Sequence, residues 1–151
     1  MISILCPTYN GLKRLEPSAS VGAHIGWGLE NKEAPLRILP NQKNFELKTV
    51  DHTANHYYVL STIINLGLIG ISEKKELPEP LPSDGPSYAL KRLPSRWDDI
   101  KAYLESDAGS LFKRALGNEL SDLNTKVRAY DMEHYYKFTL FEEIKELTTR
   151  Y

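Results

Sequence analysis

The sequence predicts an α+β fold, in which a few short antiparallel strands pack on one buried helix and a group of helices follows. Two observations carry the first part of this prediction. Short apolar runs broken by proline, glycine and asparagine fill the first third of the chain, and one long apolar run, 54–71, follows them. Beyond a proline-rich stretch, apolar residues recur every three or four positions, which is typical of amphipathic helices.

Composition limits the class of protein. The 151 residues have the size of one domain, and 41% hydrophobic and 26% charged residues are ordinary for a globular core. A net charge of −1 argues against a broad surface for nucleic acid or anionic membrane. The single cysteine, Cys6, excludes an internal disulfide, and the sequence has no Cys/His cluster typical of zinc sites. We therefore expect a cytoplasmic protein without a secretory leader or membrane span.

The first fifty residues predict short elements separated by turns. Pro7 ends the first element, and Pro35 makes another strand irregular. The expected elements are a strand at Ile2–Leu5, a helical turn at Leu12–Leu15, a strand at Val21–Gly28, an irregular strand within Ala34–Leu39, a hairpin turn at 41–43 and a strand at Phe45–Val50.

The long apolar run predicts a helix at about Ala54–Ile71, with Asp51 or Thr53 as its N-cap. Its apolar residues lie on nearly all sides, and a helix that is apolar all round is usually buried. We expect it to be the central core element, with Tyr57 and Tyr58 packed there rather than against a ligand.

Residues 73–94 form the next segment and contain five prolines. This composition predicts an exposed proline-rich loop that is too long for a plain connector. Either a functional loop or a partner-binding segment fits the pattern.

Helices are predicted from there to the end. A capping box of Ser95 and Asp98 precedes one at Trp97–Leu104, and a short helix then ends at Gly117. A second capping box, Thr139 with Glu142, begins the last helix. Between these lies one apolar helix face, predicted to be core or interface, made of Leu116, Leu120, Leu123, Val127, Tyr130 and His134.

Charged residues gather around the central strands. Lys32 and Arg37 flank the first segment, while Glu46 and Lys48 are two positions apart and share one face of a strand. A carboxylate between cations suits an anionic substrate, or a metal together with phosphate. A solvated face of salt-bridged charges has the same spacing, so the spacing alone leaves both interpretations open.

Four segments, in order and with compatible gaps, resemble motifs in the C-terminal part of the glutamine synthetase catalytic domain. Residues 6–15 read C-P-T-Y-N-G-L-K-R-L, similar to P-T-x-N-S-x-K-R-L, and residues 27–37 read W-G-L-E-N-K-E-A-P-L-R, similar to W-x-x-x-N-R-x-A-x-x-R. F-E-L-K at 45–48 with D-H-T-A-N-H-Y at 51–57 resembles E-x-R-x-P-D-x-x-A-N-P-Y, and L-I-G-I at 68–71 resembles G-L-x-G-I. The type I branch that includes FluG-like proteins is the most similar.

The resemblance implies an ATP-dependent carboxylate–amine ligase of glutamine biosynthesis. In that family ATP phosphorylates the side-chain carboxylate of glutamate and ammonia displaces the phosphate, with Mg²⁺ (or Mn²⁺) present. By resemblance, Glu46 is a metal ligand and Arg14 holds the glutamate carboxylate. Lys32 and Arg37 are catalytic residues that contact the reacting phosphoryl group, and Lys48 binds substrate or phosphate.

The chain also departs from the family pattern. Lys32 and Lys48 stand where the family has arginine, and lysine keeps the charge but loses the bidentate fork. Ser20 takes the place of a glutamate that closes the family's active site. Most of the family's metal-binding glutamates and its ATP-binding histidine motif lie before the segment that residues 1–151 resemble. We therefore expect a single partial catalytic domain that lacks most metal and ATP ligands.

Three roles fit these observations. The chain is part of a working ligase for glutamate, ammonia or another amine, and ATP, acting as a homo-oligomer or beside a complementary chain that carries the N-terminal part. Alternatively it is a truncated, inactive relative that serves as a structural or interaction module. The third role is a small anion- or nucleotide-binding domain that kept the basic residues.

Overall fold

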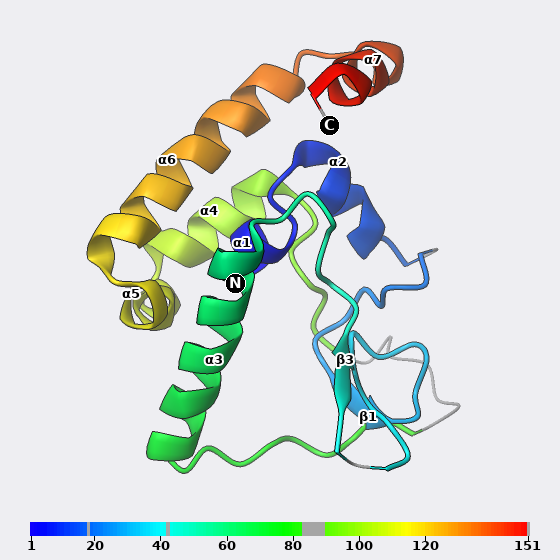
Figure 1. Ribbon diagram of the computed structural model, residues 1–151, viewed down its shortest axis with the longest axis vertical. Helices are drawn as coiled ribbons and strands as arrows, with labels where there is room; N and C mark the ends of the chain where they lie inside the picture. Colours follow the sequence, from blue (N-terminus) through cyan, green and yellow to red (C-terminus); the bar gives the residue numbers. More distant parts are fainter. Residues whose placement is uncertain (18, 42, 83–89, 151) are drawn as a thin grey trace.

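The structure is a computed structural model, and it describes residues 1–17, 19–41, 43–82 and 90–150. It contains helices and a small sheet, in agreement with the α+β prediction, and the helices make up most of it (Figure 1). They are, in order, α1 (Ile2–Leu5), α2 (Tyr9–Leu12), the 3₁₀ turn η1 (Lys13–Leu15), α3 (His56–Ser72), α4 (Trp97–Glu105), the 3₁₀ turn η2 (Asp107–Gly109), α5 (Ser110–Leu116), α6 (Asn118–Tyr135) and α7 (Leu140–Arg150).

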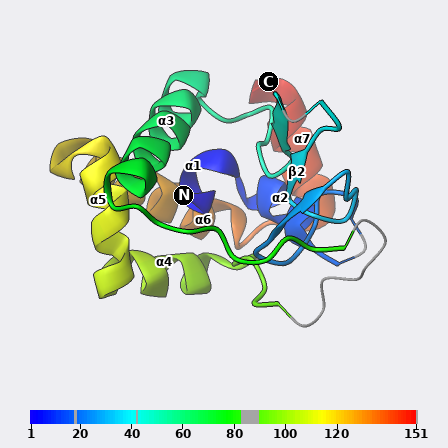
Figure 2. The same ribbon diagram turned by 90° about the horizontal axis from the view of Figure 1, so that it is seen from below.

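The strands of the described residues form one small sheet in the order β1 (Trp27–Leu29), β2 (Leu36–Ile38) and β3 (Phe45–Leu47). The predicted hairpin is confirmed, because β2 and β3 pair antiparallel around the turn. The first pair is not antiparallel as predicted: β1 and β2 run parallel, with Trp27 opposite Leu36. Figure 2 shows this sheet at one end of the molecule and α3, α4 and α5 at the other.

The prediction of a strand at Ile2–Leu5 is wrong, since these residues form the helix α1. All four side chains are buried, so this segment lacks the alternation of exposed and buried positions that is typical of a strand with one solvent-facing side. The turn satisfies its own backbone, because the amide of Cys6 donates to the carbonyl of Ile2 at 2.8 Å. The carbonyl of Leu5 accepts from the amide of Asp51 at 2.7 Å, which joins α1 to the segment before α3.

A continuous strand at Val21–Gly28 is also absent, because pairing in that range is limited to an isolated bridge at His24 and the start of β1. Gly22 interrupts it with a φ of +88°, and a Cβ there would lie 2.6 Å from the carbonyl oxygen of Glu33. The expected helical turn at Leu12–Leu15 is present in shifted form, as α2 followed by η1.

The helix α3 has nearly the predicted bounds but not the predicted burial. Within it only Val59 and Thr62 are buried, because α1 and α5 cover one side of the helix (Figure 1). The other side carries side chains that are 58–82% exposed, namely Tyr57, Leu60, Ile64, Leu68 and Ile71. Its N-cap is Asn55 rather than Asp51 or Thr53.

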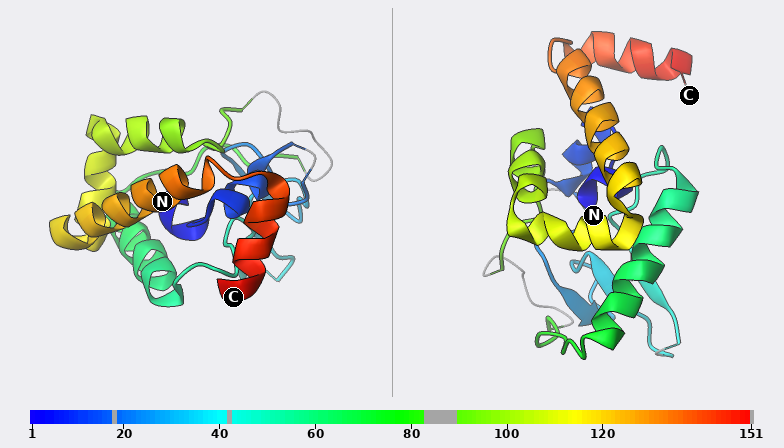
Figure 3. Two further views of the ribbon diagram at one scale, coloured as in Figure 1. Left: turned by 90° about the horizontal axis from the view of Figure 1, so that it is seen from above. Right: turned by 90° about the vertical axis from the view of Figure 1, so that its left-hand side faces the viewer.

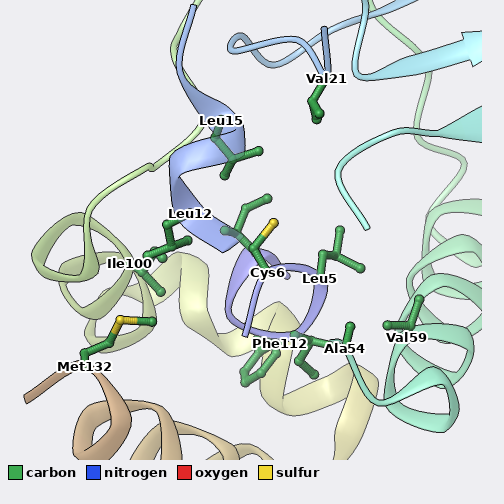
Figure 4. Packing of buried hydrophobic residues seen from close by; sticks show 12 residues of the cluster. Leu5, Cys6, Leu12, Leu15, Val21, Ala54, Val59, Ile100, Phe112 and Met132 are labelled. Atoms are coloured by element: carbon green, nitrogen blue, oxygen red, sulfur yellow. The ribbon is translucent and has the colours of Figure 1, made fainter. Parts of the chain in front are cut away.

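The core is instead built around the first fifteen residues. Figure 4 shows Leu5, Cys6 and Leu12 facing side chains from the later helices. These partners are Val59, Ile100, Phe112 and Met132, and they are joined by Ala54 from the segment just before α3. The N-terminal segment thus packs against α3 and α6, which both also pack against α5.

The C-terminal helices follow the predicted boundaries closely. Gly117 ends α5 with a φ of +81°, and the Thr139–Glu142 capping box is formed, with the Thr139 amide 2.8 Å from Glu142 Oε2. The Ser95–Asp98 box is not formed, because Arg96 is the N-cap residue of α4 and no side chain caps it. None of the helices among the described residues is both long and apolar enough to cross a membrane.

The helix α6 turns its apolar face outward. Its buried residues are Ser121, Asn124, Met132 and Tyr135. Of the predicted apolar face, Leu120, Leu123, Val127 and Tyr130 are 40–72% exposed, while Leu116 and His134 are half-buried. Of the two predictions for this face, core is therefore wrong and interface stays a prediction.

Candidate anion-binding site

The turn between β1 and β2 carries Lys32 and is held by Asn31, which is fully buried. Its Oδ1 accepts from the amides of Glu33 at 2.7 Å and Ala34 at 3.1 Å, an Asx turn. Its Nδ2 donates to the carbonyl of Pro82. The described part of the proline-rich loop thus packs along this turn, and Trp27 Nε1 also donates to the carbonyl of Pro78 at 2.8 Å.

Lys48 follows β3 and connects three segments. Its ammonium donates to the carbonyl of Ser20 at 3.0 Å and to the carbonyl of Lys32, while its own carbonyl accepts from Arg14 Nη2 at 3.5 Å. Burial lowers the pKa of Lys48, and the charges of nearby carboxylates, Glu46 first, oppose this shift. The lysine therefore fixes loop carbonyls as well as adding positive charge.

Arg37 and Glu46 lie directly opposite each other on β2 and β3. Arg37 Nη1 is 3.2 Å from Glu46 Oε2, and Nη2 is 3.6 Å from Glu30 Oε1. The Nε atoms of Arg37 and Arg14 are buried and have no hydrogen-bond partner among the described residues. Each of these two guanidinium groups therefore has one buried donor without a hydrogen bond to the described residues.

The structure thus brings the five predicted site residues together. Arg14, Lys32 and Lys48 meet through backbone carbonyls, and the charge of Arg37 influences the pKa of Lys48. The roles assigned to these side chains by resemblance stay predictions. Sequence reasoning missed Asn31, although an asparagine two positions before Glu33, in a turn, is a recognisable Asx-turn signal.

The described residues do not form a metal centre by themselves. Glu46 is about half exposed and already paired with Arg37, and the part of the chain that the structure describes holds no group of three or more His, Cys, Asp or Glu side chains placed to bind a metal. A divalent cation needs several oxygen ligands, of which Glu46 would supply one.

A cavity of about 680 Å³ lies elsewhere, between α2, the start of α4 and the C-terminal half of α6. Its walls include Tyr9, Lys13, Trp97, Lys101, Met132 and Lys137, and none of the predicted site residues. Charges of both signs line it, because Glu16, Asp98 and Glu133 lie there with the basic residues.

The fold and site define an α+β domain whose strand hairpin gathers arginine and lysine beside the carboxylates of Glu30 and Glu46. The model of the glutamine synthetase catalytic domain matches residues 1–146, and the chain belongs to this family. This confirms the resemblance given by the four sequence motifs.

Relatives with curated names agree with the family. The chain is 33% identical over 123 residues to type-1 glutamine synthetase 1 of Dictyostelium discoideum, covering 76% of this chain and 24% of the relative. It is 30% identical to a gamma-glutamylpolyamine synthetase of Streptomyces coelicolor, in a match that covers 85% of this chain and 30% of the relative. It is 28% identical to a glutamine synthetase of Staphylococcus aureus, in a match that covers 85% of this chain and 31% of the relative. The chain spans about a quarter to a third of the length of these relatives.

Proposed function

We propose that this chain supplies the phosphate- and carboxylate-facing part of an ATP-dependent carboxylate–amine ligase that joins glutamate to ammonia or another amine. The supporting observation is the convergence of Arg14, Lys32, Arg37 and Lys48 around one hairpin in a chain of this family. A transferring phosphoryl group spreads negative charge over its oxygens, and cations fixed in advance stabilise that charge.

Within this proposal each residue has a distinct task. Arg37 faces the transferring phosphoryl group, while Arg14 orients the substrate carboxylate. Lys32 and Lys48 add charge without the two-pronged geometry of arginine, so they steer anions rather than fix their orientation. In the whole enzyme ATP is the co-substrate, Mg²⁺ or Mn²⁺ neutralises phosphate charge, Glu46 offers one oxygen ligand, and the setting is cytoplasmic.

A binding experiment tests this proposal. The thermal melt of the purified chain is compared with and without Mg²⁺-ATP and glutamate. A ligand that binds only the folded state adds about 2.7 kcal/mol of stability at a hundred times its dissociation constant. We expect a clear upward shift of the midpoint that disappears in Arg37→Ala and persists in Arg96→Ala, a matched change of an exposed arginine at the start of α4.

The outcomes separate the roles. A cooperative melt that no ligand shifts contradicts the proposal and favours a structural or interaction module, for which the exposed apolar side of α3 is the specific observation. A shift with ATP or inorganic phosphate that Arg37→Ala abolishes, but that glutamate does not increase, supports an anion-binding domain instead. We expect no steady glutamine formation by this chain alone, because Glu46 by itself does not make a metal site.

A further inference from the structure

Residues 78–82, in the described part of the proline-rich stretch, are a segment that the proposed function does not use. They read P-E-P-L-P, so proline alternates with residues that keep a backbone N–H. Proline favours an extended backbone and offers only its carbonyl for hydrogen bonds. Figure 1 shows the chain running from the end of α3 to the sheet, and the right-hand view of Figure 3 shows it beside the blue strand β1. An extended segment rich in carbonyl groups thus lies along the edge of the sheet that β1 forms.

Hydrogen bonds hold this segment to β1 and to the turn after it at three points. Trp27 Nε1 donates to the carbonyl of Pro78 at 2.8 Å, and the carbonyl of Trp27 accepts from the amide of Leu81, also at 2.8 Å. The third point is the bond from Asn31 Nδ2 to the carbonyl of Pro82. The side chains of the segment are exposed apart from Leu81, which is half-buried. These bonds, rather than extensive apolar packing, therefore keep the segment in place.

The Asn31 side chain also shapes the turn that carries Lys32. Its Oδ1 accepts from the amides of the two residues that follow Lys32, while its Nδ2 depends on Pro82. Because Asn31 is fully buried, water does not replace a partner that is lost. Both ends of this amide have to be satisfied together, so the position of the turn depends on the docking of the 78–82 segment.

Lys32 is the cation of the candidate site that depends most on this turn. Its side chain is exposed and forms no ion pair with the described residues, whereas Arg37 is held by Glu30 and Glu46. The backbone of Lys32 is fixed instead, because its carbonyl accepts from the ammonium of Lys48. An unpaired ammonium is available to an anion, and the backbone of the turn decides where that ammonium can reach.

We propose that Asn31 is a positioning residue that directs Lys32 toward a bound phosphate group, and that the docked 78–82 segment holds Asn31 in place. Asn31 acts through Lys32, because its own amide is buried and occupied at both ends. This role rests on the proposed function, since the anion is the one that the candidate site binds. It gives the described start of the proline-rich stretch a task within the chain.

Amide hydrogen exchange without any ligand tests the hold of the segment on the turn. Leu81→Pro removes the amide that donates to Trp27, and proline suits a segment that already contains three. Leu81→Ala is the matched control, because it shortens the same side chain and keeps the amide. We expect Leu81→Pro to accelerate exchange of the Glu33 and Ala34 amides about tenfold relative to Leu81→Ala, the effect of losing one hydrogen bond of a buried group.

A double-mutant cycle tests the action of Asn31 through Lys32. Inorganic phosphate is titrated into the full chain and followed by ¹H–¹⁵N NMR. Asn31→Ser keeps an oxygen for the turn, loses the donor to Pro82 and changes no charge. We expect Asn31→Ser and Lys32→Met each to weaken phosphate binding about threefold to fivefold, as for an exposed ion pair. The double variant is expected to bind no more weakly than Lys32→Met, and Lys126→Met, an exposed lysine on α6, to bind like wild type.

Circular dichroism melts confirm that each variant is folded. If Asn31→Ser does not fold, Leu81→Pro takes its place in the cycle with Lys32→Met, with the same expected results. Weakening by Asn31→Ser that is equally large in the Lys32→Met background would overturn the proposal, because the substitution then acts on the whole site.

Two further results count against it. Phosphate affinity that neither Asn31→Ser nor Leu81→Pro changes contradicts the positioning role, and equal exchange in Leu81→Pro and Leu81→Ala contradicts the hold of the segment on the turn. A wild-type chain that binds no phosphate overturns the proposed function, and with it the task of Asn31 in binding. The exchange comparison still decides in that case whether the 78–82 segment holds the turn.

Discussion

At the residue scale, Cys6 marks the point where the N-terminal segment meets the chain that leaves β3. Its side chain is fully buried and its thiol donates to the carbonyl of Thr49 at 3.0 Å. Burial, and then the charge of Asp51, raise the pKa of the thiol to about 12, while Arg14 opposes the shift. The thiol is therefore protonated and unreactive in the folded protein at neutral pH.

This shift makes stability depend on alkaline pH. The folded thiol keeps its proton up to about pH 12, whereas an ordinary thiol loses it near 9. The stabilising contribution is therefore complete below pH 9 and is lost as the pH rises from there toward 12. We expect the difference in unfolding free energy between wild type and Cys6→Ala to shrink by about 2 kcal/mol between pH 8 and pH 10.5.

Urea denaturation of both proteins at several pH values measures this difference. The two proteins differ only at this position, so the contribution of every other group cancels in the comparison. A gap that stays constant with pH would show that the thiol does not titrate differently on folding.

At the scale of single elements, caps fix where the helices begin. Asn55 Oδ1 accepts from the amide of Tyr57 at 3.0 Å and from that of Tyr58 at 3.4 Å, which satisfies the first amides of α3. Asp51 is buried and serves the preceding turn instead, where it accepts from the amide and the hydroxyl of Thr53, both at 2.8 Å.

Removing the cap tests this division of roles. We expect Asn55→Ala to lower the free energy of unfolding by about 1 kcal/mol, the usual effect of losing an N-cap side chain. Asn44→Ala, an exposed position next to β3, is the matched control and is expected to change stability by less than about 0.5 kcal/mol. Equal effects of the two substitutions in urea denaturation would contradict the role given to Asn55.

At the scale of the whole molecule, the last helix is tied back to the first residues of the chain. Lys13 Nζ lies 2.6 Å from Glu143 Oε2, although the two residues are separated by most of the sequence. Glu143 is 3% exposed, whereas the Lys13 side chain is 45% exposed. Figure 1 shows α7 crossing back over α2, where this ion pair holds it.

Breaking the ion pair leaves a buried carboxylate without its partner. A fully buried pair loses about 3–5 kcal/mol when one partner is removed, and the exposure of Lys13 reduces this to about 1–2 kcal/mol. We expect Lys13→Met to lower the free energy of opening of α7 by that amount, which accelerates amide hydrogen exchange in this helix. The double variant Lys13→Met/Glu143→Leu is expected to restore slow exchange. Lys145→Met on the exposed side of α7 is the control, and acceleration in it would show that α7 is held differently.

The sequence allowed prediction of the β2–β3 hairpin, of the bounds of α3 and α4, of the end of α5 and the start of α7, and of five charged residues that the fold brings near the hairpin. Local rules decide these features: turn residues, caps and apolar periodicity act over a few neighbouring positions. The predicted strand at Ile2–Leu5 was wrong because a short apolar segment that is buried on all sides carries no periodicity to distinguish strand from helix.

The sequence by itself determined the family, through four motifs in order, and with it the residues that form the candidate site. Only the tertiary structure decided which apolar faces are covered. The helix α3 is apolar all round yet half exposed, and α6 buries serine and asparagine while its leucines face outward. Burial depends on which elements are adjacent, and that follows from long-range contacts such as those of α1, which no local pattern records.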